Sequence, residues 1–211
     1  FSEAVSAFDS ALSIDPDFAQ ASFDKGLALT AQKKYEQAGD AFDYVLVLTP
    51  ENSRAWLEKG RASAFLGYHD EAVAAFDRAL AIDPASPAAH FERGRSQSAL
   101  HRYDDAIDSF DRCLALDPNQ YPALHEKGLA LFLSGRYDDA VSAYNQAVLL
   151  NSSDARLLVD KAEALYILRR FDDVIGACDQ AIDLEMETPN VHAIKGRALI
   201  QTGRFEDAVI A

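Results

Sequence analysis

Apolar and small residues recur along this chain at a fixed interval of 34 residues. The interval separates the members of an aromatic row, a glycine row and a proline row: Phe8, Phe42, Phe76 and Phe110; Gly26, Gly60, Gly94 and Gly128; Pro16, Pro50, Pro84 and Pro118. A fixed period of this length predicts an array of one small structural unit. Such arrays usually provide binding surfaces and not catalytic sites.

The period also sets the expected boundaries. With Ala19 as position 1, complete repeats cover residues 19–52, 53–86, 87–120, 121–154 and 155–188. Residues 1–18 match the second half of a repeat, and residues 189–211 match a truncated one. We therefore expect residues 1–211 to form a single array that is part of a longer one.

Each repeat is predicted to form two helices. The first covers positions 2 to 14, as in Arg54 to Leu66, and the second covers roughly positions 17 to 30, as in His101 to Leu116. Acidic pairs at positions 18 and 19 favour the start of the second helix, and the proline at position 32 favours its end. The mid-helix glycine at position 8 predicts close contact with the second helix, with alanine at position 20 as the opposing surface. The aromatic residue at position 24 and the small residue at position 27 are expected to fill the gap between successive repeats.

These positions resemble the tetratricopeptide repeat (TPR) family over the whole chain. The repeat at 53–86 carries the family's signature residues: Trp56, Gly60, Gly67, Ala72, Phe76, Ala79 and Pro84. The resemblance implies an all-α fold, a right-handed α-α superhelix of antiparallel helix pairs. It also implies a concave groove, lined by the first helices, that holds a peptide or a helix of a partner.

The groove face can be assigned from helix geometry. Positions 2, 5, 9 and 12 share one face of the first helix, with position 13 beside them. The expected peptide-binding residues on this concave face are Phe23, Leu27, Arg54, Leu57, Arg61, Phe65, Phe91, Arg95, His125, Leu129, Phe132, Arg156, Glu163, Tyr166 and Arg197.

The family's usual leucine at position 7 is replaced by a cation in every repeat, and an acid precedes this cation in five of six repeats. This pattern predicts a charge ladder across repeats. The chaperone-tail clamp of some family members needs lysine at position 5, which no repeat here has, so that clamp is not expected.

Charge differs between the two helix layers although the whole chain has a net charge of −14. Positions 1 to 14 of the first helices hold 11 cations and 6 acids, and the remainder holds 9 cations and 28 acids. This partition predicts a mildly basic inner wall suited to an acidic-amphipathic peptide. The alternative is that Arg61 and Arg95 pair with Glu58 and Glu92 on their own helices.

Catalytic and cofactor chemistry is not indicated, and we expect neither enzyme activity nor a cofactor or metal. The histidines form no HExxH motif or close cluster with cysteine; His90 and His192 are expected in the core or at its boundary, and His125 on the groove face. Cys113 and Cys178 are expected to be reduced core thiols, which fits a cytoplasmic location. The acidic charge argues against nucleic acid as a partner, and no apolar run approaches the length of a membrane span.

The sequence thus favours a non-catalytic scaffold for protein–protein interaction. The alternative is an accessory array of a larger enzyme or signalling protein that positions its substrates. A third hypothesis is end-to-end self-association of the array. The repeat at 155–188 is the least regular, with Ala162, Val174 and Cys178 at signature positions, and we expect faster amide exchange there than in residues 19–120.

Overall fold

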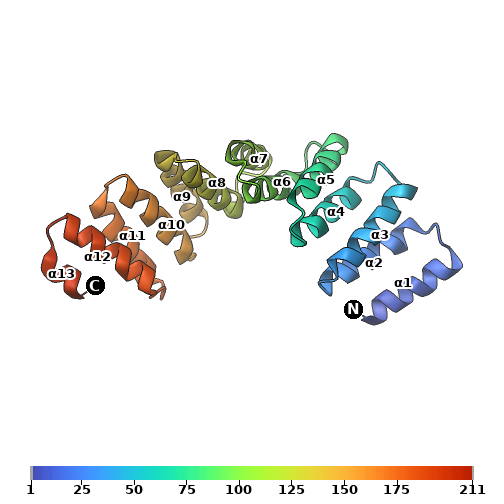
Figure 1. The fold of residues 1–211 in the computed structure, drawn as a ribbon, viewed down its shortest axis with the longest axis horizontal. Helices are drawn as coiled ribbons and strands as arrows, with labels where there is room; N and C mark the ends of the chain where they lie inside the picture. The colour runs from blue at the N-terminus through green and yellow to red at the C-terminus, as the bar shows by residue number, and fades with distance from the viewer. Residues whose placement is uncertain (1, 211) are drawn as a thin grey trace. The chain divides into compact units, whose positions relative to one another are not determined.

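The computed structural model describes residues 2–210, and side chains up to residue 208. These residues form helices and turns, with no strand in the described range. By its internal contacts the chain divides into two compact blocks, the N-terminal block Phe1–Leu116 and the C-terminal block Asp117–Ala211. The predicted all-α fold of consecutive helix pairs is confirmed (Figure 1).

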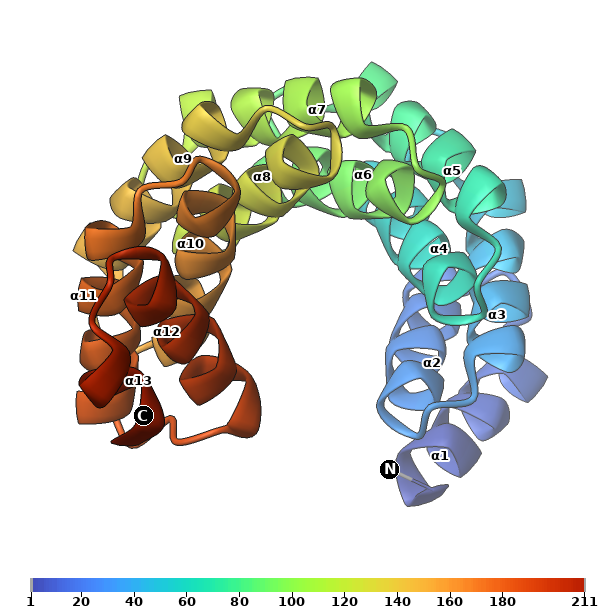
Figure 2. The same ribbon diagram turned by 60° about the vertical axis from the view of Figure 1, so that its left-hand side comes forward.

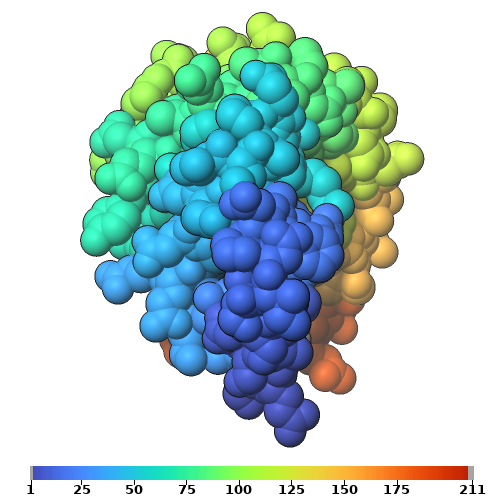
Figure 3. All heavy atoms as spheres, turned by 90° about the vertical axis from the view of Figure 1, so that its right-hand side faces the viewer, coloured from blue at the N-terminus to red at the C-terminus, as the bar shows by residue number. Residues whose placement is uncertain are grey.

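The N-terminal block contains three first helices that begin at the expected repeat starts. They are α2 (Ala19–Ala31), α4 (Ser53–Phe65) and α6 (Pro87–Ala99), and the second helices are α1 (Ser2–Ile14), α3 (Tyr35–Leu48), α5 (His69–Ile82) and α7 (Tyr103–Leu116). Within this block α2, α4 and α6 form an inner layer, and the second helices form an outer layer (Figure 2). The end of the block that carries α1 is seen in Figure 3, where α1 forms the outermost layer and none of its described residues is buried.

The C-terminal block repeats the same two-layer plan. Its first helices are α8 (Tyr121–Leu133), α10 (Ala155–Ile167) and α12 (Pro189–Gln201), and its second helices are α9 (Tyr137–Leu150), α11 (Phe171–Asp183) and α13 (Phe205–Ile210).

The glycine at position 8 faces the aromatic residue at position 24 of its own repeat. A Cβ atom added to Gly60 would lie 2.5 Å from a ring carbon of Phe76, and one added to Gly128 would lie 2.5 Å from a ring carbon of Tyr144. The expectation that alanine at position 20 is the surface opposing the glycine is therefore wrong in these repeats, because the ring at position 24 lies nearest to the added Cβ atom. The ring occupies the space that a Cβ atom would need, so the helices of one repeat interlock through this pair.

The repeat at 155–188 supports the same explanation because both members of the pair change together. It has Ala162 where other repeats have glycine and Cys178 where they have an aromatic ring. Both residues are buried. Without a ring opposite, position 8 has room for a methyl group.

The turn between the two helices of a repeat differs from the prediction. His101 was expected inside the second helix, but it has φ of 59° and lies in the turn before α7. The backbone N–H of Arg102 then donates to the carbonyl of Gln97, which closes the C-terminal end of α6. Gly67, Gly135 and Gly203 occupy the same position with positive φ, which glycine adopts without steric cost.

Side chains at position 34 cap four first helices. Asn52 and Ser86 accept hydrogen bonds from the backbone N–H groups of Ala55 and Ala89, and Asp154 and Thr188 do the same in the C-terminal block. Position 4 adds a link back to the preceding loop, because Trp56 Nε1 donates to the carbonyl of Pro50 at 2.9 Å. These contacts fix where these four first helices begin, and so they fix the register of their exposed faces.

Candidate peptide-binding face

The predicted groove residues lie on the first helices, and their accessibility varies widely. Arg54, Phe65, Arg95, Leu129, Arg156 and Arg197 are exposed. Leu27, Leu57, Arg61, Phe91, His125, Phe132, Glu163 and Tyr166 are half-buried. We call the surface formed by positions 2, 5, 9, 12 and 13 the groove face, and treat it separately in each block.

Phe23 is the exception, because it belongs to the core and is only 5% exposed. Its ring packs against Phe42 with centroids 5.7 Å apart, and the guanidinium of Arg54 lies 5.2 Å from its centroid. The Phe23 ring therefore lies under the guanidinium of Arg54 and has no surface open to a ligand.

Arg61 joins two neighbouring first helices by ion pairs. Its Nη1 donates to Glu58 on the same helix at 2.8 Å, and its Nε donates to Glu92 on α6 at 3.1 Å. Arg95 lies 3.6 Å from Glu92 and 5.9 Å from the centroid of Phe91. The predicted pairing within one helix is present for both arginines, and the bridge from Arg61 to α6 extends it across the repeat boundary.

A pocket of about 150 Å³ lies between α4 and α6, next to this bridge. We call it the anchor pocket; it is lined by Arg61, Ala64, Phe65, His69, Glu92, Arg95, Ser96 and Ala99. Phe65 is 62% exposed, and its ring stacks on Tyr35 with centroids 4.6 Å apart and planes at 10°. The pocket thus combines an aromatic wall, a floor of small residues and a charged rim.

Sequence reasoning missed several of these residues, including Tyr35, Ala64, His69, Ser96 and Ala99. A signal was present, because positions 12 and 13 carry larger side chains in the C-terminal block. The larger residues are Phe132 and Leu133 in one repeat and Tyr166 and Ile167 in the next. In α4, position 12 is Ala64 instead of a large side chain, which leaves a hollow beside Phe65.

The groove face of the C-terminal block has a different polar pattern. His125 Nε2 lies 2.5 Å from Asp160 Oδ2 on the next first helix. This hydrogen bond raises the pKa of His125 above its ordinary value, against burial, which lowers it. Asn190 donates to Glu163 at 3.2 Å, and Arg156 pairs with Asp154 at 3.0 Å.

The aromatic residues of this block form edge-on pairs at the end of each first helix. Phe132 packs against Tyr137, and Tyr166 packs against Phe171, with centroids 5.4 and 5.5 Å apart. Phe132 and Tyr166 both occupy position 12, where α4 has the small residue Ala64.

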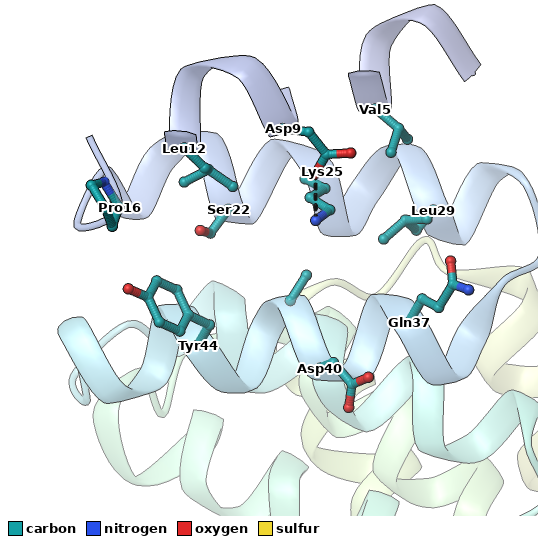
Figure 4. Close-up of a pocket in the computed structure, with 11 residues that line it drawn as sticks. Val5, Asp9, Leu12, Pro16, Ser22, Lys25, Leu29, Gln37, Asp40 and Tyr44 are labelled. Carbon is teal, nitrogen blue, oxygen red and sulfur yellow. Dashed lines mark ion pairs between the residues drawn. The ribbon is translucent and has the colours of Figure 1, made fainter. Parts of the chain in front are cut away.

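The cations at position 7 point away from the groove face. Lys25 pairs with Asp9 at 2.7 Å, as Figure 4 shows, and equivalent pairs join Lys59 to Asp43, Arg93 to Asp77 and Lys195 to Asp179. These four cations therefore form ion pairs between repeats, but with acids at position 25 of the preceding repeat and not with the position-6 acids of the predicted ladder. These cations belong to the first helices but pair with acids on the second helices. The excess of positive charge counted for the first helices is therefore not located on the groove face.

The remaining candidate chemistry agrees with a structural role. His90 is buried as expected, and burial lowers its pKa. Burial raises the pKa of the Cys178 thiol to about 11, so this thiol stays protonated near neutral pH. Residues 2–210 contain no cluster of three or more side chains suited to a metal ion. None of the helices in this range has the length and apolar character needed to cross a membrane.

Comparison with known proteins identifies the class. The sequence profile of the tetratricopeptide repeat family matches residues 1–53, 41–87, 57–121, 91–155 and 125–185. These matches overlap along most of the chain, and the protein belongs to this family. No match appears among curated proteins.

Solved structures with the same fold include three other proteins. YrrB, described as a TPR protein with an unusual peptide-binding site, is 19% identical, with a TM-score of 0.78 over 90% of this chain and 97% of its own. MamA is 21% identical, with a TM-score of 0.74 over 76% of this chain and 94% of its own. PilF of Pseudomonas aeruginosa is 17% identical, with a TM-score of 0.75 over 90% of this chain and 86% of its own. At these identities the similarity shows the fold alone.

Proposed function

We propose that the protein is a non-catalytic interaction scaffold whose N-terminal block binds a peptide segment of a partner protein along α2, α4 and α6. The anchor pocket is the observation that carries this proposal. An aromatic side chain that is 62% exposed beside a hollow of small residues is costly to leave in water. A partner side chain that enters the hollow removes this surface from water.

The rim of the pocket favours a ligand that carries both apolar and acidic groups. Arg95 is exposed at the mouth, and a guanidinium binds carboxylates in a bidentate geometry. An apolar or aromatic side chain in the hollow, next to a carboxylate that reaches Arg95, satisfies both parts of the pocket. The proposed ligand is therefore an acidic-amphipathic peptide with one buried anchor.

Reversing the charge of Arg61 is a poor test of this proposal. Arg61 bridges Glu58 and Glu92, so Arg61→Glu places three carboxylates together and destabilises the helix pair irrespective of any ligand. Filling the hollow is a cleaner perturbation. Ala99 is exposed at the pocket, and Ala99→Leu occupies the space without removing a contact from the core.

The experiment is selection of a displayed random peptide library on the wild-type protein, followed by affinity measurement on variants. Ala74→Leu is the matched control, because Ala74 is an exposed alanine on the outer helix α5. We expect selected peptides to share an apolar residue near an acidic residue. Their affinity should fall at least about tenfold with Ala99→Leu and stay unchanged with Ala74→Leu. Peptides that bind both variants as tightly as wild type would overturn the proposal.

A further inference from the structure

A second pocket lies on the outer layer of the N-terminal block, between α5, α6 and α7. It has a volume of about 330 Å³ and is lined by Asp77, Leu80, Ala81, Pro84, His90, Arg93 and Arg112. Two guanidinium groups and a single carboxylate therefore line this pocket. This balance is unusual for an outer layer in which acids far outnumber cations.

Arg93 is held in place by two direct partners, and a third residue supports one of them. Its Nε donates to Ser109 Oγ at 3.0 Å and its Nη1 donates to Asp77 at 2.9 Å. Ser109 in turn donates to Gln97 Oε1 at 2.6 Å. Because Ser109 and Gln97 are almost fully buried, the guanidinium is fixed before any ligand arrives.

The charge ladder does not require this network. Four other repeats, counting the truncated one, have lysine, leucine and alanine at the same three positions, as in Lys25, Leu29 and Ala41. Lys25 forms its ladder ion pair without any buried polar support. Burying a glutamine and a serine costs free energy that apolar residues avoid, so the network indicates a need to orient Arg93.

Arg112 supplies the second cation from α7. It is exposed, and within residues 2–210 it has no ion pair or hydrogen bond. Nη2 of Arg93 also has no hydrogen bond within this range. His90 also lines the pocket; its Nε2 is 3.1 Å from the carbonyl of Pro84, and its lowered pKa keeps the ring neutral near pH 7.

Equivalent outer pockets elsewhere in the chain lack this excess of positive charge. The pocket between α1, α2 and α3, shown in Figure 4, has Lys25 with Asp9 and Asp40 in its lining. In the C-terminal block the pocket between α11, α12 and α13 pairs Lys195 and Arg204 with Asp179 and Asp207. Of these three pockets, the one on α5 to α7 has more cations than acids.

We propose that this pocket binds an oxyanion, a phosphate or carboxylate group, between Arg93 and Arg112. Guanidinium groups match the planar geometry of two adjacent oxyanion oxygens, and two of them from different helices define one site. The proposed site lies on the outer layer and is independent of the peptide proposed for the groove face.

The test is a titration of the protein with inorganic phosphate at constant ionic strength, followed by nuclear magnetic resonance signals of the arginine Nε groups. We expect saturable shifts of Arg93 and Arg112. Arg112→Gln should weaken phosphate binding at least about tenfold, because it removes the exposed guanidinium. Arg78→Gln is the matched control: Arg78 has the same repeat position, and its guanidinium lies over the ring of Trp56, 5.8 Å from the centroid. It should leave binding unchanged.

A second variant tests the role of the buried network. Arg93→Lys/Gln97→Leu/Ser109→Ala installs the residues found in the repeat of Lys25, Leu29 and Ala41, so it should keep the fold and the ion pair to Asp77 but weaken phosphate binding. Shifts that grow linearly with phosphate and are equal in Arg112→Gln and wild type would overturn the proposal.

Two further arms distinguish the source of the oxyanion. A short phosphoserine peptide that binds more tightly than inorganic phosphate, while its unphosphorylated form does not bind, assigns the site to a protein-borne phosphate. Tighter binding of inorganic phosphate assigns it to a free anion. Acetate that competes with phosphate extends the site to carboxylates, and acetate that does not compete restricts it to phosphate.

Discussion

The contact between the position-8 glycine and the position-24 ring predicts that replacing glycine by alanine has opposite effects on stability at Gly60 and at Gly39. Gly60→Ala places a methyl group 2.5 Å from Cε1 of Phe76, whereas Gly39→Ala on α3 places one where nothing lies within 4 Å. Unstrained carbon atoms sit about 3.5–4.0 Å apart, so at Gly60 the ring or the helix must move by about 1 Å. Phe76 is fully buried, and the ring has no open space to enter.

The size of each effect follows from two contributions. Alanine is preferred over glycine inside a helix by up to about 1 kcal/mol, and this preference favours both substitutions. Overpacking a dense core costs roughly 1–3 kcal/mol and applies only at Gly60. We therefore expect Gly39→Ala to stabilise the fold by about 0.5–1 kcal/mol. Gly60→Ala should destabilise it by about 1–2 kcal/mol.

Urea unfolding followed by circular dichroism measures both changes, and amide exchange in α4 and α5 locates the second one. Because arrays can unfold in segments, the comparison requires an unchanged dependence on urea. In a Phe76→Cys background, which copies the pair Ala162 and Cys178, the cost of Gly60→Ala should disappear. Equal stabilisation by Gly60→Ala and Gly39→Ala in the wild-type background would refute the reasoning.

Three further predictions concern the turns and the ion pairs. His101→Gly should stabilise the fold by about 0.5–1 kcal/mol in urea unfolding, because it relieves the positive φ of 59°. Burial lowers the pKa of Lys161, and the preceding repeat has Asn145 at position 25, where other repeats have an acid. Asn145→Asp supplies that acid and should raise the pKa of Lys161, which a titration of the lysine side chain would detect. The hydrogen bond to Asp160 raises the pKa of His125 in the folded protein, so it stabilises the fold when His125 is protonated. This stabilisation is complete below a pH of about 6.5 and is lost as the pH rises through the folded-state pKa. Unfolding of wild type and His125→Gln at a series of pH values should show this slope in wild type alone.

The sequence was sufficient to predict the helix pairs because their signals are local and repeated. The proline at position 32 and the acidic pair at positions 18 and 19 mark helix ends in repeat after repeat. The sequence predicts alanine as the partner of the position-8 glycine, because two small residues allow close contact between helices, and this prediction is wrong. Only the distance from the Gly60 position to the Phe76 ring shows that a large aromatic side chain fills this space.

The candidate site was predicted less completely, and the reason is physical. Helix periodicity places residues on a face, and most of the predicted groove residues are accessible there. It does not show whether a neighbour covers a side chain, as Arg54 covers Phe23, or whether a cation turns to the other layer, as Lys25 turns to Asp9. The anchor pocket was missed because a hollow depends on residues from two repeats at once.

The most direct test of the proposed binding face is a crystal structure of the protein with a peptide selected as described above. We predict an apolar side chain of the peptide in contact with Phe65 and Ala99, and a carboxylate of the peptide paired with Arg95. A peptide seated on the outer helices, with the anchor pocket still empty, would contradict the proposed function.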